Sequence, residues 1–139
     1  MTAAGYSGTP LPRKLGFKPD MRAALLAAPH GFDDVLGALP EGVRLTRRLG
    51  GSFDLVLVFV TRRVDLARRL DALRASIAPD GMLWVAWPKR ASGVATDVTE
   101  GVIREVALPT GLVDTKVCAI DATWSGLRLV IRQELRRAP

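Results

Sequence analysis

The stretch FDLVLVFV, residues 53–60, decides the fold class of this chain. All of its residues except Asp54 are apolar, and most are β-branched or aromatic, which favours a strand over a helix. Because the apolar residues are continuous rather than alternating, we expect both faces of this strand to be buried, as in parallel sheets. The stretch therefore predicts the central strand of a sheet that carries helices on both sides.

Further apolar runs on either side of this stretch predict neighbouring strands. Residues 21–28 (MRAALLAA) and 82–87 (MLWVAW) again have the continuous pattern of strands buried on both faces. Within the second run, Trp84 and Trp87 are three positions apart, so they point to opposite faces and are expected in the core. Residues 42–49 alternate apolar and basic side chains, which is typical of a short edge strand.

Between these predicted strands, apolar residues recur at the spacing of helices. Residues 61–78 place leucines and an isoleucine at i, i+4, i+7 and i+11, which predicts a long amphipathic helix. In that helix Asp65 and Arg69 have the i,i+4 spacing of an ion pair. A shorter helix is predicted over residues 32–39, with two aspartates in its first turn.

The C-terminal part of the chain predicts one more helix and two strands. Asp97 and Glu100 have the spacing of a capping box, which marks the start of the helix. Residues 112–120 and 127–135 are predicted strands, and the six residues between them are too few for a parallel crossover, so they must form an antiparallel hairpin. The sequence thus predicts a three-layer Rossmann-like open α/β sheet, mostly parallel, with a C-terminal antiparallel hairpin.

The length of 139 residues and the 48% share of hydrophobic residues suit one folded domain. We expect an N-terminal extension over residues 1–20, with a short helical turn, and a single Rossmann-like domain over residues 21–139. Arg13 and Lys14 of the extension could cross the strand ends as a lid or dock on a neighbouring chain, as in a homodimer. The sequence leaves both alternatives open.

The chain carries a formal charge of +6, from 16 Arg and 4 Lys against 14 acidic residues. Such a chain attracts polyanions, but no nucleic-acid-binding motif supports more than a possible interaction. The single cysteine, Cys118, has no zinc-ligand spacing and is predicted to be a small buried hydrophobe, so we expect no metal. The sequence shows neither an export signal nor an apolar run of about 20 residues, which predicts a cytoplasmic protein without a membrane span.

Polar and basic side chains follow the predicted strands at one edge of the sheet, where open α/β sheets bind their ligands. The candidate ligand-binding residues are His30, Thr61, Arg62, Lys89, Arg90, Ser92 and Trp124. Together with helix amino ends, these cations favour an anionic small molecule or a phosphorylated partner. The same residues also fit solvated loops in an Arg-rich chain, and that alternative stays open.

The candidate residues lack a catalytic arrangement. A histidine such as His30 could serve as a general base, but the sequence places no nucleophile beside it, and Ser92 has no adjacent base. Trp124 could stack on a ligand ring or fold back over the sheet edge. We therefore expect ligand binding rather than catalysis, with the identity of any cofactor unknown.

The order of elements resembles the later two-thirds of a class I methyltransferase, with APDGMLWVAW (residues 78–87) similar to that family's passage from helix to strand. Three motifs resemble an uncharacterised bacterial family known as domain of unknown function 3052; they are YSGTPLPRKLG (residues 6–16), WPKRASGVATDVTE (87–100) and DATWSGLRLV (121–130). The first resemblance implies a Rossmann-like core and S-adenosylmethionine as cofactor. The second covers nearly the whole chain and implies no activity.

The chain departs from the methyltransferase pattern at the cofactor site. The turn after the first strand, residues 27–32 (AAPHGF), has one glycine where that family has a glycine-rich turn. Arg47 and Arg48 stand where an acidic residue would bind the ribose hydroxyls. A reduced methyltransferase is therefore the alternative to anion binding, and a protein-interaction or regulatory subunit is a third possibility.

Overall fold

The computed structural model of the chain describes residues 8–136 and is centred on one six-stranded sheet. The strands are β1 (Arg22–Leu26), β2 (Arg44–Thr46), β3 (Phe53–Phe59), β4 (Ile77–Pro88), β5 (Leu112–Ala119) and β6 (Trp124–Ile131). Their order in the sheet is β2-β1-β3-β4-β6-β5. The first four strands pair in parallel, and β6 is antiparallel to both of its neighbours.

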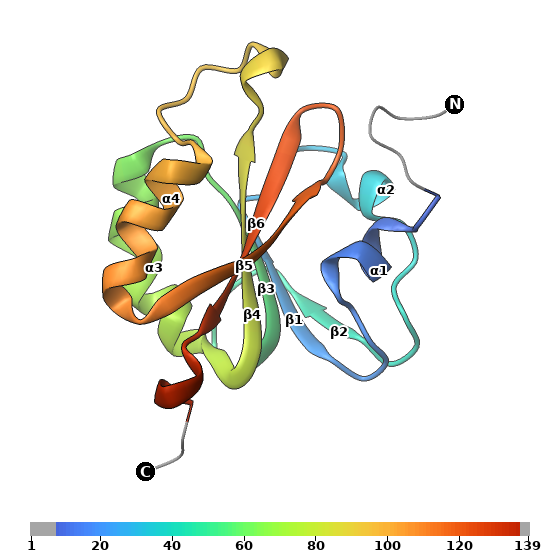
Figure 1. The fold of residues 1–139 in the computed structure, drawn as a ribbon. Helices are drawn as coiled ribbons and strands as arrows, with labels where there is room; N and C mark the ends of the chain where they lie inside the picture. The colour runs from blue at the N-terminus through green and yellow to red at the C-terminus, as the bar shows by residue number, and fades with distance from the viewer. Residues whose placement is uncertain (1–7, 137–139) are drawn as a thin grey trace.

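Helices cover both faces of this sheet (Figure 1). They are α1 (Leu11–Leu15), α2 (Phe32–Leu36), α3 (Arg63–Ser76) and α4 (Glu100–Ala107), with 3₁₀ turns η1 (Arg90–Ser92), η2 (Leu108–Thr110) and η3 (Gln133–Leu135). Helices α3 and α4 lie on one face, and α1 and α2 lie on the other. The predicted fold class is confirmed, including the antiparallel C-terminal hairpin.

The central strands are buried on both faces, as their continuous apolar sequence predicts. Leu55, Val56 and Leu57 of β3 are each at most 1% exposed, although alternate side chains point to opposite faces. Trp84 and Trp87 of β4 belong to the core clusters on opposite faces, as predicted. The sheet therefore separates two apolar cores, one under α3 and α4 and one under α1 and α2.

Helix α1 is fastened to the sheet by two long-range hydrogen bonds. The indole Nε1–H of Trp84 donates to the Leu15 carbonyl at 2.7 Å, and Nζ of Lys14 donates to the Ala119 carbonyl at 2.9 Å. Leu15 itself is fully buried. Helix α1 lies where the sequence predicts a short helical turn, whereas residues 1–7 of the predicted extension lie outside the described residues.

Two strand boundaries differ from the sequence prediction. Strand β4 begins at Ile77, which pairs with Phe53, so residues 79–81, which separate the predicted helix from the predicted strand, form an irregularity inside the strand. Strand β6 begins at Trp124, which pairs with Pro88, and it ends at Ile131. Cross-strand pairing thus extends β6 at its start, and the η3 turn replaces the predicted end of the strand.

The predicted capping box at the start of α4 is wrong. The helix begins at Glu100, so Thr99 is its N-cap, and its hydroxyl oxygen accepts from the Val102 N–H at 3.1 Å. The carboxylate of Asp97 instead accepts from the Arg63 N–H at 2.7 Å, in the first turn of α3. Asp97 therefore stabilises α3 and not α4, a role that sequence spacing cannot indicate.

No helix within residues 8–136 has both the length and the apolar composition that crossing a membrane requires.

Candidate functional site

The candidate site lies at the carboxyl ends of β1 and β3. The chain leaves β1 toward α2 on one face and leaves β3 toward α3 on the other, so this position is the topological switch point of the sheet. A cavity of about 290 Å³ opens there, and we call it the switch-point pocket. Its lining residues are Ala27, Phe59, Val60, Thr61, Asp65, Arg68, Arg69 and Trp124.

One wall of the switch-point pocket is aromatic. The half-buried Trp124 ring meets Phe59 edge to face at a centroid distance of 4.9 Å. Phe59 in turn meets Phe32 of α2 at 4.8 Å. Edge-to-face packing of this kind fixes the orientation of the rings, so the indole is held in one position at the pocket.

The opposite wall comes from the first half of α3 and is cationic. Arg68 pairs with Asp65 at 2.8 Å, so the predicted pair of Asp65 with Arg69 is wrong, because the i+3 position is also within reach on a helix. Arg69 makes no ion pair within residues 8–136. Two arginines against one aspartate leave the lining with a net charge of +1.

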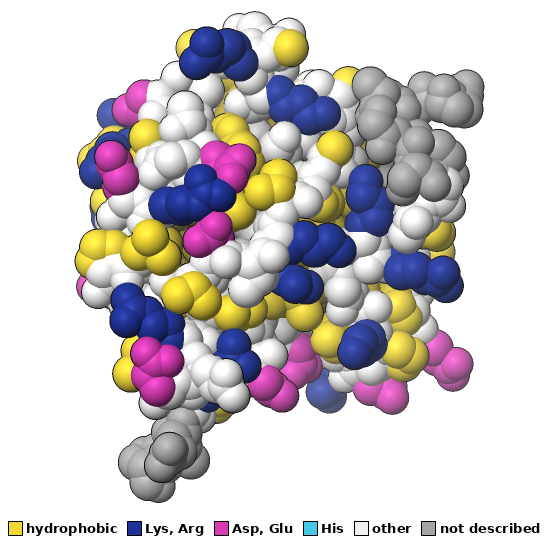
Figure 2. All heavy atoms as spheres, viewed as in Figure 1, with side chains coloured by type: hydrophobic (Ala, Val, Ile, Leu, Met, Phe, Trp, Pro, Cys, Tyr) yellow, Lys and Arg dark blue, Asp and Glu magenta, His cyan; other side chains and the backbone are white. Residues whose placement is uncertain are grey.

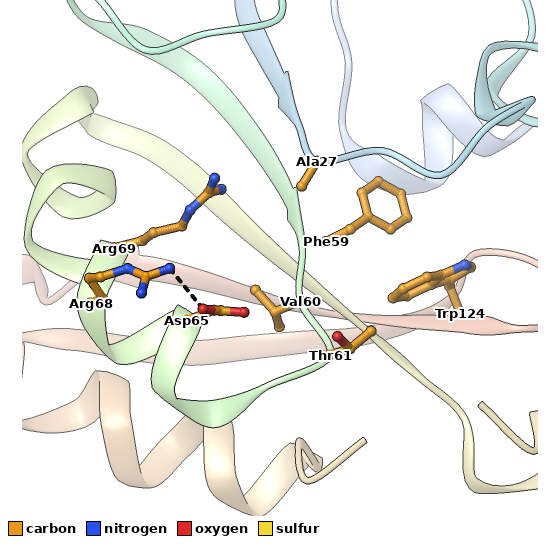
Figure 3. Close-up of a pocket in the computed structure, with 8 residues that line it drawn as sticks. All are labelled: Ala27, Phe59, Val60, Thr61, Asp65, Arg68, Arg69 and Trp124. Atoms are coloured by element: carbon orange, nitrogen blue, oxygen red, sulfur yellow. Dashed lines mark hydrogen bonds and ion pairs between the residues drawn. The ribbon is translucent and has the colours of Figure 1, made fainter. Parts of the chain in front are cut away.

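Figure 3 shows that the two walls lie on either side of the end of β3. Arg69 extends from α3 toward Ala27 at the end of β1, and Trp124 lies on the far side of Phe59 and Thr61. A ligand in the pocket would therefore meet a guanidinium group on one side and an indole on the other.

The backbone at Ala27 is in the left-handed region, with φ of 57°. Such a conformation costs an L-residue roughly 1–2 kcal/mol, because its Cβ crowds the following carbonyl. Strained residues of this kind concentrate at binding sites, and Ala27 is exposed in the lining of the switch-point pocket.

His30 lies in a different depression from the one that holds Thr61 and Trp124. That depression has a volume of about 280 Å³ and is lined by Ala28, Pro29, His30, Gly31, Phe32, Asp33, Asp34 and Arg47. Arg47 and Asp33 form an exposed ion pair across it at 2.9 Å.

Arg62, Lys89, Arg90 and Ser92 also lie outside the lining of the switch-point pocket. Arg90 and Ser92 belong to η1, in a loop that projects beyond the edge of the sheet (Figure 1). The Ser92 hydroxyl donates to the Lys89 carbonyl at 2.7 Å and accepts from the Val94 N–H at 3.2 Å, which satisfies it locally. Of the predicted site residues, the structure thus brings together Thr61 and Trp124.

The cationic wall of α3 was not predicted from the sequence. Arg68 and Arg69 are on the polar face of an amphipathic helix, where arginines are usually solvated. The one sequence signal for this wall is that both arginines are in the first two turns of the helix that follows β3. Such a helix starts at the carboxyl edge of the sheet, so its first turns lie near the site. The helix amino end contributes less than expected, since Asp97 already accepts from the Arg63 N–H.

Basic side chains are spread widely over the surface. Figure 2 shows Lys and Arg in small groups across the viewed face, separated by uncharged and acidic side chains, and not in one continuous stripe. That face therefore lacks the basic track expected of a protein that follows a nucleic-acid backbone.

Within residues 8–136, no group of three or more His, Cys, Asp or Glu side chains is placed to hold a metal ion. Cys118 is buried, as predicted, and its burial raises the pKa of the thiol. The protonated thiol is a weak nucleophile, so Cys118 behaves as a core residue.

One family profile, described as Protein of unknown function (DUF3052), matches residues 47–133. The chain belongs to the DUF3052 family. The matched region holds every residue that lines the switch-point pocket except Ala27. A comparison with curated proteins finds no match.

Solved structures of methyltransferases share the fold of this DUF3052 protein. A ribosomal protein L11 methylase from Lactobacillus delbrueckii subsp. bulgaricus has a TM-score of 0.60 at 13% identity, covering 88% of this chain and 76% of that one. A SAM-dependent methyltransferase from Aquifex aeolicus has a TM-score of 0.62 at 12% identity, covering 86% and 87%. At such identities the likeness concerns the fold alone, and it confirms the predicted Rossmann-like methyltransferase core.

The residues at the corresponding strand ends do not fit S-adenosylmethionine. The turn after β1 reaches Gly31 only after Pro29 and His30, so side chains stand where the cofactor needs close backbone approach. Beyond β2, Arg47 is ion-paired with Asp33, which engages one of the carboxylates that could accept from the ribose hydroxyls. We therefore derive no methyl-transfer step from this site.

Proposed function

We propose that this DUF3052 domain binds a small anionic molecule that carries a flat ring, in the switch-point pocket. The observation that supports this function best is Arg69, a guanidinium group without an acidic partner in residues 8–136 that lines one pocket with an aromatic wall. The proposed activity is binding, as in a ligand-responsive or carrier domain.

The chemistry of the two walls defines the class of ligand. A guanidinium group binds a phosphate or carboxylate through two parallel hydrogen bonds, and an indole gives a flat apolar surface for a ring. The Thr61 hydroxyl adds one donor and one acceptor between them. The volume of about 290 Å³ is at the lower end of the roughly 300–1,000 Å³ range of ligand pockets, which favours a single ring with one anionic group.

A thermal-shift panel on the full chain tests this proposal. The panel contains inorganic phosphate, mononucleotides, phosphorylated sugars, aromatic carboxylates, S-adenosylmethionine, its demethylated product and single-stranded nucleic acid. A ligand at a hundred times its Kd should stabilise the fold by about 2.7 kcal/mol, which raises the Tm by several degrees at this chain length. We expect the largest shift from a phosphorylated or carboxylated ring.

Two sets of variants then locate the site. Arg69→Gln should weaken binding of the ringed anion with little loss of stability, because Arg69 is exposed at the pocket. Trp124→Ala should also weaken binding, and it should lower stability moderately because its half-buried ring packs on Phe59. The matched control is the Arg62→Gln, Lys89→Gln double variant, which removes cations predicted from the sequence but outside the pocket lining. If only the double variant loses affinity, the binding site lies in the loops after β3 and β4, which also carry Arg90 and Ser92.

A reduced methyltransferase is the second candidate function, and the fold shared with solved methyltransferases is the observation that favours it. A shift with S-adenosylmethionine and its demethylated product, but not with other ringed anions, would replace the anion-binding proposal by this one. A panel without any shift would favour the third candidate, a protein-interaction or regulatory subunit.

A further inference from the structure

A second pocket lies on the α3 side of the sheet, and the proposed function does not use it. It has a volume of about 310 Å³, and we call it the side pocket. Its lining residues are Leu26, Arg47, Arg48, Leu49, Arg69, Ala72 and Leu73. Arg69 is the residue that lines both this pocket and the switch-point pocket.

The side pocket follows from how the chain connects β2 to β3. Residues 47–52 make this connection without a helix, so no helix within residues 8–136 covers β1 and β2 on this face, and α4 lies on the other side of α3. The floor of the pocket contains Leu26 and Leu73, which are 7% and 0% exposed, and Leu49 packs against the same core cluster. An apolar depression thus reaches the main core at the edge of the sheet.

The rim of the side pocket is cationic and contains no carboxylate. Arg47 is neutralised by Asp33, but Arg48 and Arg69 make no ion pair within residues 8–136. Two unpaired guanidinium groups beside an apolar floor repel each other and favour a bound anion. The combination is complementary to a molecule with an apolar body and one negative end.

We propose that the side pocket binds the aliphatic chain of an amphipathic anion, an acyl carboxylate or an alkyl phosphate, with its head group at Arg48 and Arg69. The chain lies against Leu26, Leu49 and Ala72, and the head group forms charge-assisted hydrogen bonds with the guanidinium groups. This site does not depend on the ringed anion of the proposed function. Because Arg69 lines both pockets, occupation of one changes the charge that the other presents.

Binding of hexyl, octyl and decyl phosphate to the full chain, measured by calorimetry below their micelle concentrations, tests the proposal. Each buried CH₂ should strengthen binding about fourfold until the chain fills the pocket. Octanol should bind more weakly than octyl phosphate. Equal affinities across the series, or equal affinities of octanol and octyl phosphate, would overturn the proposal.

The variant Ala72→Trp fills the side pocket from an exposed position of α3, so the fold should tolerate it. In this variant the affinity for alkyl phosphates should no longer depend on chain length. The control is Ala75→Trp, at an exposed position of the same helix outside the linings of both pockets, and it should keep that dependence. Arg48→Gln should weaken the binding of every alkyl phosphate by about tenfold, the usual loss when a charged hydrogen bond is removed. Unchanged chain-length dependence in Ala72→Trp would place the alkyl chain elsewhere and reject the site.

The same variants separate this proposal from the proposed function. Ala72→Trp should still bind the ringed anion, and Trp124→Ala should still bind decyl phosphate with the affinity of the parent chain. If Trp124→Ala binds decyl phosphate more weakly than the parent chain and Ala72→Trp does not, both ligands bind in the switch-point pocket. That result would reject the side-pocket proposal and leave the proposed function standing.

Discussion

The two faces of the sheet are covered in different ways. On one face α3 has 14 residues and α4 has eight, and α3 buries Leu66, Leu70 and Leu73 against the sheet. On the other face α1 and α2 have five residues each, too few for a helix to be stable without tertiary contacts. The first face thus carries most of the helical structure, and the second depends on contacts such as that between Trp84 and Leu15.

The switch-point pocket lies where these two faces meet. Arg68 and Arg69 come from the long helix, whereas Ala27 precedes the short helix α2 and Trp124 packs against the core cluster of that same face. A rigid cationic wall therefore faces residues whose support is local and weaker. We expect ligand binding to stabilise the α1 and α2 face more than the α3 and α4 face.

Truncation of a core leucine on each face gives the largest expected effect. Leu70→Ala should lower the free energy of unfolding by an amount in the upper part of the roughly 2–5 kcal/mol range for such changes, because α3 is held at both ends and cannot close the cavity. Leu36→Ala, in the five-residue α2, should lie in the lower part of that range, since the short helix can relax. Urea unfolding of both variants measures the difference, and equal losses would show that the two faces are equally rigid.

Trp84→Phe tests how α1 is held. The change removes the indole N–H and leaves the buried Leu15 carbonyl without its donor, which should cost about 1–3 kcal/mol. The loss should concentrate in α1, so trypsin should cut after Arg13 or Lys14 faster than in the parent chain. Lys14→Met removes the part-buried ammonium donor to the Ala119 carbonyl but keeps an apolar stem. It is the control and should have a smaller effect on stability.

The fold was predictable because the apolar runs follow the two periods that define its elements. Residues 53–60 indicate a strand buried on both faces, and the spacing of Leu66, Leu70 and Leu73 indicates α3. The sequence could not show that Asp97 caps α3, because that hydrogen bond joins residues 34 positions apart. The ends of β4 and β6 were also missed, since cross-strand pairing and not local composition determines where a ladder stops.

The candidate site was predictable only in its place on the sheet. The rule that ligands bind at the carboxyl ends of strands indicated the correct edge, and Thr61 and Trp124 lie in the pocket there. Arg68 and Arg69 were missed because a helical polar face looks the same in sequence whether or not it borders a cavity. Which loop cations turn away from the pocket depends on loop paths such as that through η1, which sequence patterns do not encode.

Removal of the long-range cap of α3 should have a moderate effect. Asp97→Ala should lower the free energy of unfolding by about 1 kcal/mol, the usual loss when a capping carboxylate is removed. Asp97→Asn keeps an acceptor oxygen and should lose much less. Thermal unfolding of the two variants compares them, and equal losses would mean that the charge of Asp97, rather than its hydrogen bond to Arg63, stabilises the helix.

The smallest expected effect comes from Asp114 of β5, which joins α4 to the sheet. Nε of Arg104 donates to its carboxylate at 2.8 Å, and this hydrogen bond lowers the pKa of Asp114 below its ordinary value. The ionised carboxylate therefore stabilises the folded chain above the pKa of an unfolded aspartate, and that contribution is lost as the pH falls through the lowered pKa. Asp114→Asn should consequently have a lower Tm than the parent chain at pH 7, and the difference should shrink under acidic conditions. The control is Asp80→Asn, at an exposed position of β4 without an ion pair in residues 8–136, and its Tm difference from the parent chain should not change with pH in this way. If the Tm difference of Asp114→Asn persists at low pH, packing and not charge joins α4 to β5.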